Sequence, residues 1–355
     1  MESNSSPNSE MRYPLETDSQ PNPVSYVALG PFTRDYQIGA KGELFFEVGG
    51  PGVLGGGAAW AMASMRIWDR RVGVVSRISP AYPSSWIRRI ESAGIDTRGL
   101  QMMNDVPAEL VFGRYFENGN REAYNPLTVF PVMSLPVSEE ARHWGALDLA
   151  SQVEVIRQLS PTVKDIPEDY FRARAFHIAP MPWPLQLPIV QRLREHSILI
   201  TLDPGPHYIK SVSTDELAGL LANVDVFMPS EGEVYSHFGT GANLEDCARQ
   251  LAHLGPPVVV IKRGTQGSIV YERETERVYR IPIYPARTTD ATGAGDAYCG
   301  GFLVGLIETD DLLAAARYGT VSASFAVESL GALQLLDIER STAQERLNWF
   351  EKQMS

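Results

Sequence analysis

Short apolar runs rich in β-branched residues recur along the chain from residue 24 and predict buried strands. Most of them lack the polar alternation of a strand with one wet face, so they favour a parallel sheet covered on both sides. Between them lie stretches with helical spacing, at 84–93, 185–196, 214–222 and 244–254. This alternation predicts a doubly wound α/β fold, in which ligands bind where strands lead into helices. The runs read VSYVALG, RVGVVSRI, ARAFHIAP, ILITLDP, VDVFMPS and PVVVIKRG.

Two segments depart from this pattern and predict a small β-sheet lid over a cleft. Residues 35–48 and 107–124 alternate polar and apolar positions around Gly or Asn-Gly turns, which is typical of exposed antiparallel strands. Residues 125–169 are punctuated by prolines and predict a surface excursion, helix-poor at first, with one amphipathic segment near 147–158.

The ends of the chain differ from the domain between them. Residues 1–23 are rich in Ser, Asn, Pro and acids, a composition that predicts a disordered tail. We expect one domain over 24–340, followed by a C-terminal helix over 341–355.

Composition narrows the function classes. The chain of 355 residues has 43 acidic and 31 basic side chains, a formal net charge of -12. This balance argues against nucleic acid or an anionic membrane surface as the main partner. Because no apolar run reaches the ~20 residues of a membrane span and no export signal is visible, we expect a cytoplasmic protein. Cys247 and Cys299 lie far apart without metal-ligand spacing, which agrees with a reducing compartment.

The segment TTDATGAGDAYCGGFLVG, residues 288–305, has the strongest chemical signal. Gly293, Ala294 and Gly295 precede an apolar, helix-like stretch, and backbone N–H groups at such a helix start bind anions. Asp296 would place a carboxylate inside that anion site. This is unfavourable unless the carboxylate takes a proton from a hydroxyl that attacks a phosphoryl group. The alternative is an acid that only stabilises the helix dipole, by ~0.3–1 kcal/mol.

The same segment resembles the C-terminal signature of the PfkB (ribokinase-like) family of carbohydrate and nucleoside kinases, and weaker matches extend from about residue 24 to 335. The resemblance implies a three-layer α/β/α ribokinase-like domain with a mostly parallel central sheet and a small β-sheet lid. It also implies a kinase that uses ATP and Mg2+, with Asp296 as the catalytic base and the amides of 293–295 as the anion hole.

Two further segments resemble the family's acceptor site. In GPFTRD, Asp35 matches an acid that holds acceptor hydroxyls, although an ordinary turn acid would also fit. In GGPGVLGGGAAWAMASM, we assign Gly55 and Gly56 as the glycine pair that opens a helix, and interpret Gly49-Gly50 as a hinge. In this register Trp60 stands at the family's Asn position. Its indole either stacks on the acceptor or packs in the core.

The nucleotide and metal sites have weaker matches. In PSEGE, Glu233 matches the acid that organises Mg2+ through water, whereas Ser230 replaces an Asn; a solvated acid at a helix start is the alternative. In KRGTQG, Lys262, Gly264 and Gly267 resemble the turn near the nucleotide phosphates, and the same glycines fit a hairpin.

Three more candidate site residues are assigned by the family resemblance alone. It assigns Thr292 and Gly331 to the nucleotide site, with Gly331 near the adenine. It also raises Asp290 as a candidate residue for a monovalent cation such as K+.

The sequence therefore predicts an ATP-dependent kinase acting on a hydroxymethyl group of a sugar or sugar-like molecule, with a nucleoside as the second candidate acceptor. A non-catalytic binding or regulatory relative is the alternative, because Trp60 and Ser230 depart from the family pattern. A second subunit that covers the lid edges would give a homodimer.

Overall fold

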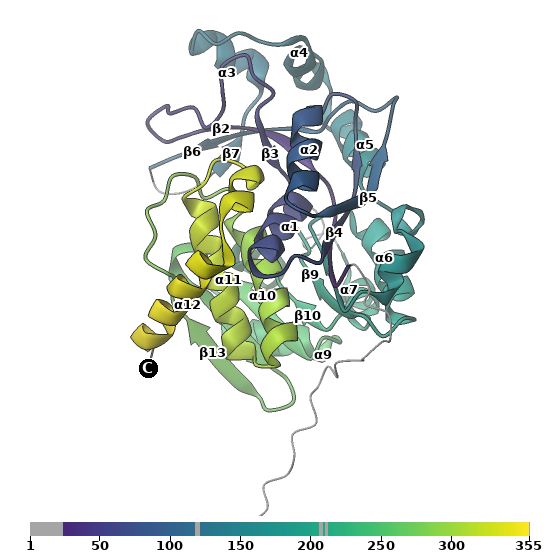
Figure 1. Ribbon diagram of the computed structural model, residues 1–355, viewed down its shortest axis with the longest axis vertical. Helices are drawn as coiled ribbons and strands as arrows, with labels where there is room; N and C mark the ends of the chain where they lie inside the picture. Colours follow the sequence, from purple (N-terminus) through teal and green to yellow (C-terminus); the bar gives the residue numbers. More distant parts are fainter. Residues whose placement is uncertain (1–23, 118–120, 206–208, 210–211, 355) are drawn as a thin grey trace, which may run out of the picture.

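The computed structural model describes residues 24–117, 121–205, 209 and 212–354 (Figure 1). The tail expected at 1–23 lies outside the described residues. In the part of the chain that the structure describes, the helices are all too short or too polar to cross a lipid bilayer.

A nine-stranded sheet forms the centre of the molecule, in the order β13-β12-β11-β10-β9-β8-β1-β4-β5. The strands from β11 to β5 all pair in parallel, whereas β12 and β13 are antiparallel additions at one edge. The mostly parallel central sheet is thus confirmed. The strands are β1 (Tyr26–Leu29), β4 (Val72–Ile78), β5 (Asp96–Met102), β8 (Ala175–Ile178), β9 (Leu199–Leu202), β10 (Val226–Phe227), β11 (Val258–Lys262), β12 (Ser268–Glu272) and β13 (Arg277–Ile281).

Helices cover both faces of this sheet, so the three-layer α/β/α architecture is confirmed. In β1, Tyr26 and Ala28 pack into one apolar core while Val27 and Leu29 pack into the other. The first core includes α1 (Gly57–Trp68), α2 (Ser84–Ser92), α10 (Ala294–Thr309), α11 (Leu312–Val327) and α12 (Arg340–Met354). The second includes α6 (Trp183–Arg194), α7 (Thr214–Leu221), α8 (Glu231–Phe238) and α9 (Leu244–His253). Both faces are covered, which explains why the strand sequences are apolar throughout.

A second sheet of four strands, in the order β3-β2-β6-β7, forms the upper part of the molecule in Figure 1. Two details of the predicted lid strands were wrong. The pair β2–β6 is parallel, and all six residues of β2 are buried rather than exposed. The strands are β2 (Thr33–Ile38), β3 (Val53–Gly55), β6 (Leu110–Tyr115) and β7 (Arg121–Ala123).

The burial of β2 has a visible cause, since the excursion after β7 folds over this small sheet. Tyr36 stacks on Phe112 with ring centroids 5.0 Å apart, and Phe112 meets Phe130 of the excursion at 5.8 Å. Arg34 forms an ion pair of 2.8 Å with Glu140. Part of the sheet is therefore covered by the chain itself, and a homodimer through the remaining edges, β3 and β7, stays a prediction.

The excursion is also more helical than its prolines suggested. Pro126 occupies the first turn of its helix, where a backbone N–H is not needed. Asn125, Ser138 and Asp148 each cap a helix through a side-chain oxygen. The segment contains α3 (Pro126–Val132), α4 (Glu139–Ala146), α5 (Leu149–Leu159) and the 3-10 turns η1 (Val163–Asp165) and η2 (Glu168–Arg172).

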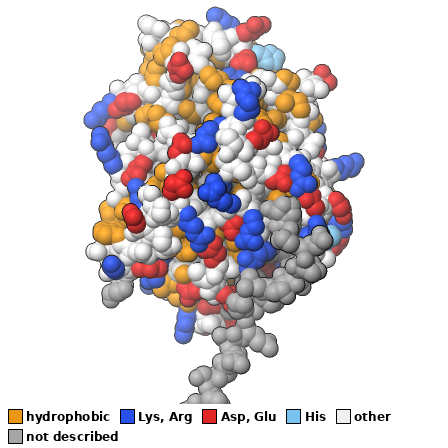
Figure 2. Space-filling model, viewed as in Figure 1, with side chains coloured by type: hydrophobic (Ala, Val, Ile, Leu, Met, Phe, Trp, Pro, Cys, Tyr) orange, Lys and Arg blue, Asp and Glu red, His pale blue; other side chains and the backbone are white. Residues whose placement is uncertain are grey.

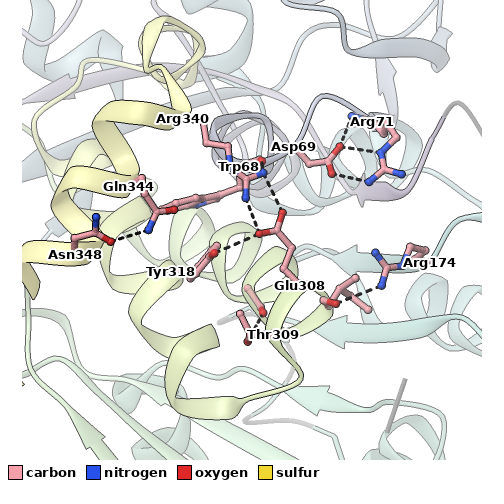
Figure 3. A network of polar contacts seen from close by, with 12 residues as sticks. Trp68, Asp69, Arg71, Arg174, Glu308, Thr309, Tyr318, Arg340, Gln344 and Asn348 are labelled. Atoms are coloured by element: carbon pink, nitrogen blue, oxygen red, sulfur yellow. Dashed lines mark hydrogen bonds and ion pairs between the residues drawn. The ribbon is translucent and has the colours of Figure 1, made fainter. Parts of the chain in front are cut away.

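The C-terminal helix α12 is fixed to the first core by a polar network (Figure 3). Arg340 donates to the carbonyl oxygen of Trp68 at the end of α1, and its Nη2 lies 2.8 Å from Glu308 of α10. Tyr318 of α11 donates to the same carboxylate at 3.3 Å. The network therefore joins the helices α1, α10, α11 and α12, which all pack in the first core.

Candidate active site

The start of α1 is the point where two of the predicted carboxylates meet. Strand β3 ends at Gly55 and α1 begins at Gly57, so Gly55-Gly56 is the glycine pair at the helix start. A Cβ atom at Gly55 would overlap the Asp35 carboxylate. A Cβ at Gly57 would lie 2.7 Å from Oδ1 of Asp296. The structure therefore brings Asp35 and Asp296 to one glycine turn, although they lie 261 positions apart in the sequence.

Asp296 lies in the first turn of α10, after Gly293 in the left-handed conformation at φ 76°. It is half-buried. The pKa of Asp296 is raised to about 7, mainly by burial and also by the Asp203 and Glu233 carboxylates, while Lys262 opposes the shift. A carboxyl group with this pKa can exchange a proton near neutral pH, as a general base must.

Asp35 is the second carboxylate of the turn and is almost fully buried, with 3% of its surface exposed. Thr33 donates to its Oδ1 at 2.5 Å. Burial raises the pKa of Asp35 to about 6, although the Thr33 hydrogen bond and Arg121 lower it. The group has unused acceptor capacity on Oδ2, beside Gly55.

A buried charge cluster lies beneath Asp296. Asp203, just after β9, forms an ion pair with Lys262 at the end of β11. The Sγ of Cys299 lies 3.6 Å from the Lys262 ammonium. Burial lowers the pKa of Lys262, but the surrounding carboxylates, Asp203 first, outweigh burial and raise it. The lysine is therefore charged and largely buried, and it is not an ordinary surface cation.

Lys262 also lies beside the proposed anion hole. A Cβ atom at Gly295 would be 3.6 Å from its Nζ. Gly264 and Gly267 flank the 3-10 turn η3 (Gly264–Gln266) and form the hairpin between β11 and β12. A Cβ at Gly267 would overlap the carbonyl oxygen of Ile281, so this glycine is required by the hairpin itself. The structure brings Lys262 to the anion hole and gives both glycines a turn role.

Glu233 takes part in a capping box at the start of α8. Ser230 donates its backbone N–H to Oε2 of Glu233 at 2.7 Å, and Glu233 N–H donates to Ser230 Oγ at 3.3 Å. Burial and then Asp203 raise the pKa of Glu233. Within the described residues, no three His, Cys, Asp or Glu side chains lie close enough together to hold a metal ion.

Trp60 lies on the core side of α1, with only 1% of its surface exposed. A Cβ at Gly293 would overlap its indole ring, so the ring supports the turn of the anion hole from behind. Its Nε1 is buried and has no hydrogen-bond partner among the residues that the structure describes. This burial favours the core-packing interpretation of Trp60 over stacking on an acceptor.

The small sheet contacts the loop before α10 through a residue that the sequence did not single out. Tyr115 Oη lies 2.6 Å from Oγ1 of Thr292. Thr292 N–H donates to Oδ1 of Asp290 at 2.9 Å, and Asp290 is 2% exposed. Gly331, the remaining nucleotide candidate, begins the 3-10 turn η4 (Ala332–Asp337) and packs against Val53 of β3.

We expect Tyr115→Phe to loosen the lid without unfolding it. A lost hydrogen bond of ~1 kcal/mol corresponds to about a fivefold change in the open population. The rate of ADP formation without an acceptor, which measures ATP hydrolysis, should rise ~3–10-fold, because water reaches the γ-phosphate of ATP more often. Tyr124→Phe is the control, since Tyr124 donates within the small sheet, to the carbonyl of Tyr36 at 3.1 Å. Equal effects of both variants would contradict a specific contact between lid and anion hole.

Comparison with known proteins agrees with this arrangement. Residues 193–338 match the model of the pfkB family carbohydrate kinases. A cytidine kinase of Thermococcus kodakarensis is 28% identical over 253 residues, which cover 71% of this chain and 79% of that protein.

Solved structures share the fold. The nucleoside kinase of Methanocaldococcus jannaschii superposes with a TM-score of 0.67 at 18% identity, covering 92% of this chain and 99% of that one. An E. coli structure assigned as ribokinase II, in complex with ATP and Mg2+, gives a TM-score of 0.64 at 18% identity, covering 92% and 99%. The ribokinase-like fold expected from the sequence is confirmed.

Proposed function

Because residues 193–338 match the model of the pfkB family carbohydrate kinases, we propose that this chain transfers the γ-phosphoryl group of ATP to a hydroxymethyl group held between Asp35 and Asp296. A single observation carries this proposal: the Asp35 and Asp296 carboxylates border one glycine turn, with the start of α10 beside it. In this arrangement Asp35 can bind hydroxyl groups of the acceptor, while Asp296 takes the proton of the reacting hydroxyl.

The chemical step follows from the residues around that turn. Asp296 accepts the proton of the hydroxymethyl group as its oxygen attacks the γ-phosphorus, and the bond from that phosphorus to the ADP oxygen breaks. The amides of 293–295 and the Lys262 ammonium stabilise charge on the transferred group. Mg2+, when bound with ATP, neutralises phosphate charge, and Glu233 would orient its water shell.

A nucleoside is the acceptor class that the relatives favour. The cytidine kinase match spans most of both chains, and a nucleoside kinase shares the fold over nearly its whole length. A free sugar remains the second candidate, since the matching family model describes carbohydrate kinases. Measuring ADP formation with a panel of nucleosides and pentoses tests both. Acceptor binding without any ADP formation would instead support the non-catalytic alternative.

The pH dependence of kcat/KM should report Asp296. The base must be ionised, and its pKa in the free protein is about 7. The rate should therefore rise tenfold per pH unit below about pH 6 and level off above about pH 8. Removing the Lys262 charge, which lowers this pKa, should move the midpoint upward in Lys262→Met. A midpoint near 4 in the wild type would contradict a buried base.

A further inference from the structure

Glu109, the residue directly before β6, has a carboxyl group that the reaction described above does not use. Only 8% of its surface is exposed. Its Oε2 is buried and has no hydrogen-bond partner within the described chain. An unpaired buried carboxyl oxygen is costly, because desolvation is not offset by any new hydrogen bond.

The surroundings of Glu109 place it at the acceptor turn. Its carbonyl oxygen accepts the backbone N–H of Arg34 at 3.0 Å, so it lies beside the residue that precedes Asp35. Tyr82 donates to the carbonyl of Phe32 at 2.5 Å, and a Cβ at Gly56 would lie 2.9 Å from Phe32 Cα. The carboxylates of Glu109 and Asp35 both act electrostatically on the Tyr82 hydroxyl. In the parallel β2–β6 register Asp35 pairs with Val111, two residues after Glu109, so the Glu109 and Asp35 side chains leave the same face of the small sheet.

The cations of this region are engaged elsewhere. Arg34 bonds to Glu140, to Tyr36 and to the carbonyl of Pro51. Arg121 donates a hydrogen bond to Gln37 at 2.8 Å. Its charge lowers the pKa of Asp35 but does not contribute to the pKa shift of Glu109. Burial and the nearby Asp35 charge raise the pKa of Glu109 to about 8. The side of the site that Glu109 occupies is acidic and lacks a matching cation.

We propose that Glu109 is an acceptor-binding residue that takes a hydrogen bond from a hydroxyl or amino group of the acceptor. Together with Asp35 it restricts the site to acceptors without a negative charge. This inference rests on the proposed kinase function, because it assumes that the acceptor occupies the turn between Asp35 and Asp296. Above about pH 8 both carboxyl groups are ionised, and an anionic acceptor would meet two like charges in a poorly solvated site, where they repel most strongly.

Matched acceptor pairs test the inference. Cytidine, uridine and orotidine differ in an amino group and a carboxylate, and ribose and ribonate differ in charge. Calorimetry without ATP measures acceptor binding, and ADP formation measures turnover separately. At about pH 8.5, where Glu109 is mostly ionised, we expect the wild type to bind uridine or ribose at least ~10-fold more tightly than its anionic counterpart.

Glu109→Gln keeps the shape of the side chain and, at the same pH of about 8.5, removes its charge. It should raise the KM of the preferred neutral acceptor ~10-fold, the scale of a charged hydrogen bond, while kcat changes less than about threefold. The KM of ATP should stay constant, and the preference against the anionic acceptor should shrink. Glu122→Gln, an exposed acid on β7, is the control in the same small sheet. Glu109→Met serves as a second variant if the glutamine protein is poorly folded.

The outcomes separate the two proposals. Unchanged acceptor KM in both Glu109 variants, or a wild-type preference for orotidine or ribonate, would overturn the role of Glu109. Binding that depends on Glu109 but yields no ADP would support this inference and contradict the kinase function. If neither acceptor class binds to the wild type, both proposals fail.

Discussion

Replacing Asp296 with asparagine should lower kcat by ~10²-fold or more, the range for the loss of a general base. Asparagine has nearly the same shape but cannot accept the hydroxyl proton. ATP affinity should change little, because the amides of 293–295 and Lys262 remain. Steady-state kinetics with saturating acceptor and calorimetry with ATP would measure the two effects separately.

Asp296→Asn should have the opposite effect on stability: it lowers kcat, but it should not lower the free energy of unfolding above pH 7. The folded-state pKa of Asp296, about 7, lies above its ordinary value of 3.8, so folding favours the protonated acid. The ionised wild type therefore loses stability as pH rises from about 4 to 7, and Asp296→Asn should not. At pH 8 the variant should melt at or above the wild-type temperature.

Asp311→Asn provides the matched control. Asp311 caps α11 by accepting the N–H of Ala314, and asparagine caps a helix equally well. Normal turnover in this control, with lost turnover in Asp296→Asn, would show that the proton acceptor matters rather than the charge at a helix start. Near-wild-type turnover in Asp296→Asn would refute the mechanism.

The sequence predicted the central sheet well because its strands are uniformly buried. Runs such as VSYVALG and PVVVIKRG become β1 and β11, and each contributes side chains to both cores. The small sheet was predicted less well. Its strand β2 reads as alternating, but Arg34 and Gln37 are buried with polar partners from distant segments. A local pattern cannot show that β7 supplies the partner of Gln37 and the later excursion that of Arg34.

Residues of the candidate site could be proposed from the sequence where glycines mark them, but not where a single acid stands without such a motif. Asp296 follows Gly-Ala-Gly, and Asp35 falls in a recognisable segment. Asp203 had a weaker signal, as an acid at the end of the apolar run ILITL. Glu109 had none, because its significance comes from burial without a partner beside Asp35.

Figure 2 illustrates why charge alone says little about the acceptor. On the face shown, acidic and basic side chains are interspersed rather than gathered in one patch. The net charge of -12 therefore excludes some partners but does not locate a site. In the proposed mechanism, the charges that select an acceptor are those of the buried or half-buried groups Asp35, Glu109 and Asp296.

Trp60→Ala should have the largest effect on stability. The indole is one of the largest fully buried side chains and packs in the first core, so its removal leaves a cavity that costs ~3–5 kcal/mol. The ring also backs Gly293, whose φ of 76° fixes the turn of the anion hole. A void behind that turn should reduce kcat, because small displacements of positioning groups slow phosphoryl transfer. Urea unfolding and steady-state kinetics measure both.

Two controls separate packing from ligand contact. Trp60→Phe keeps most of the ring volume and should recover most of the stability and kcat. Trp349→Ala removes an indole that is 42% exposed on α12 and should cost much less. If Trp60 instead stacked on the acceptor, Trp60→Ala would raise the acceptor KM by an amount matching ~0.5–1.5 kcal/mol, about 2–12-fold, with little loss of stability. That result would return Trp60 to the acceptor pocket, whereas a large stability loss with unchanged acceptor KM places the ring behind the anion hole.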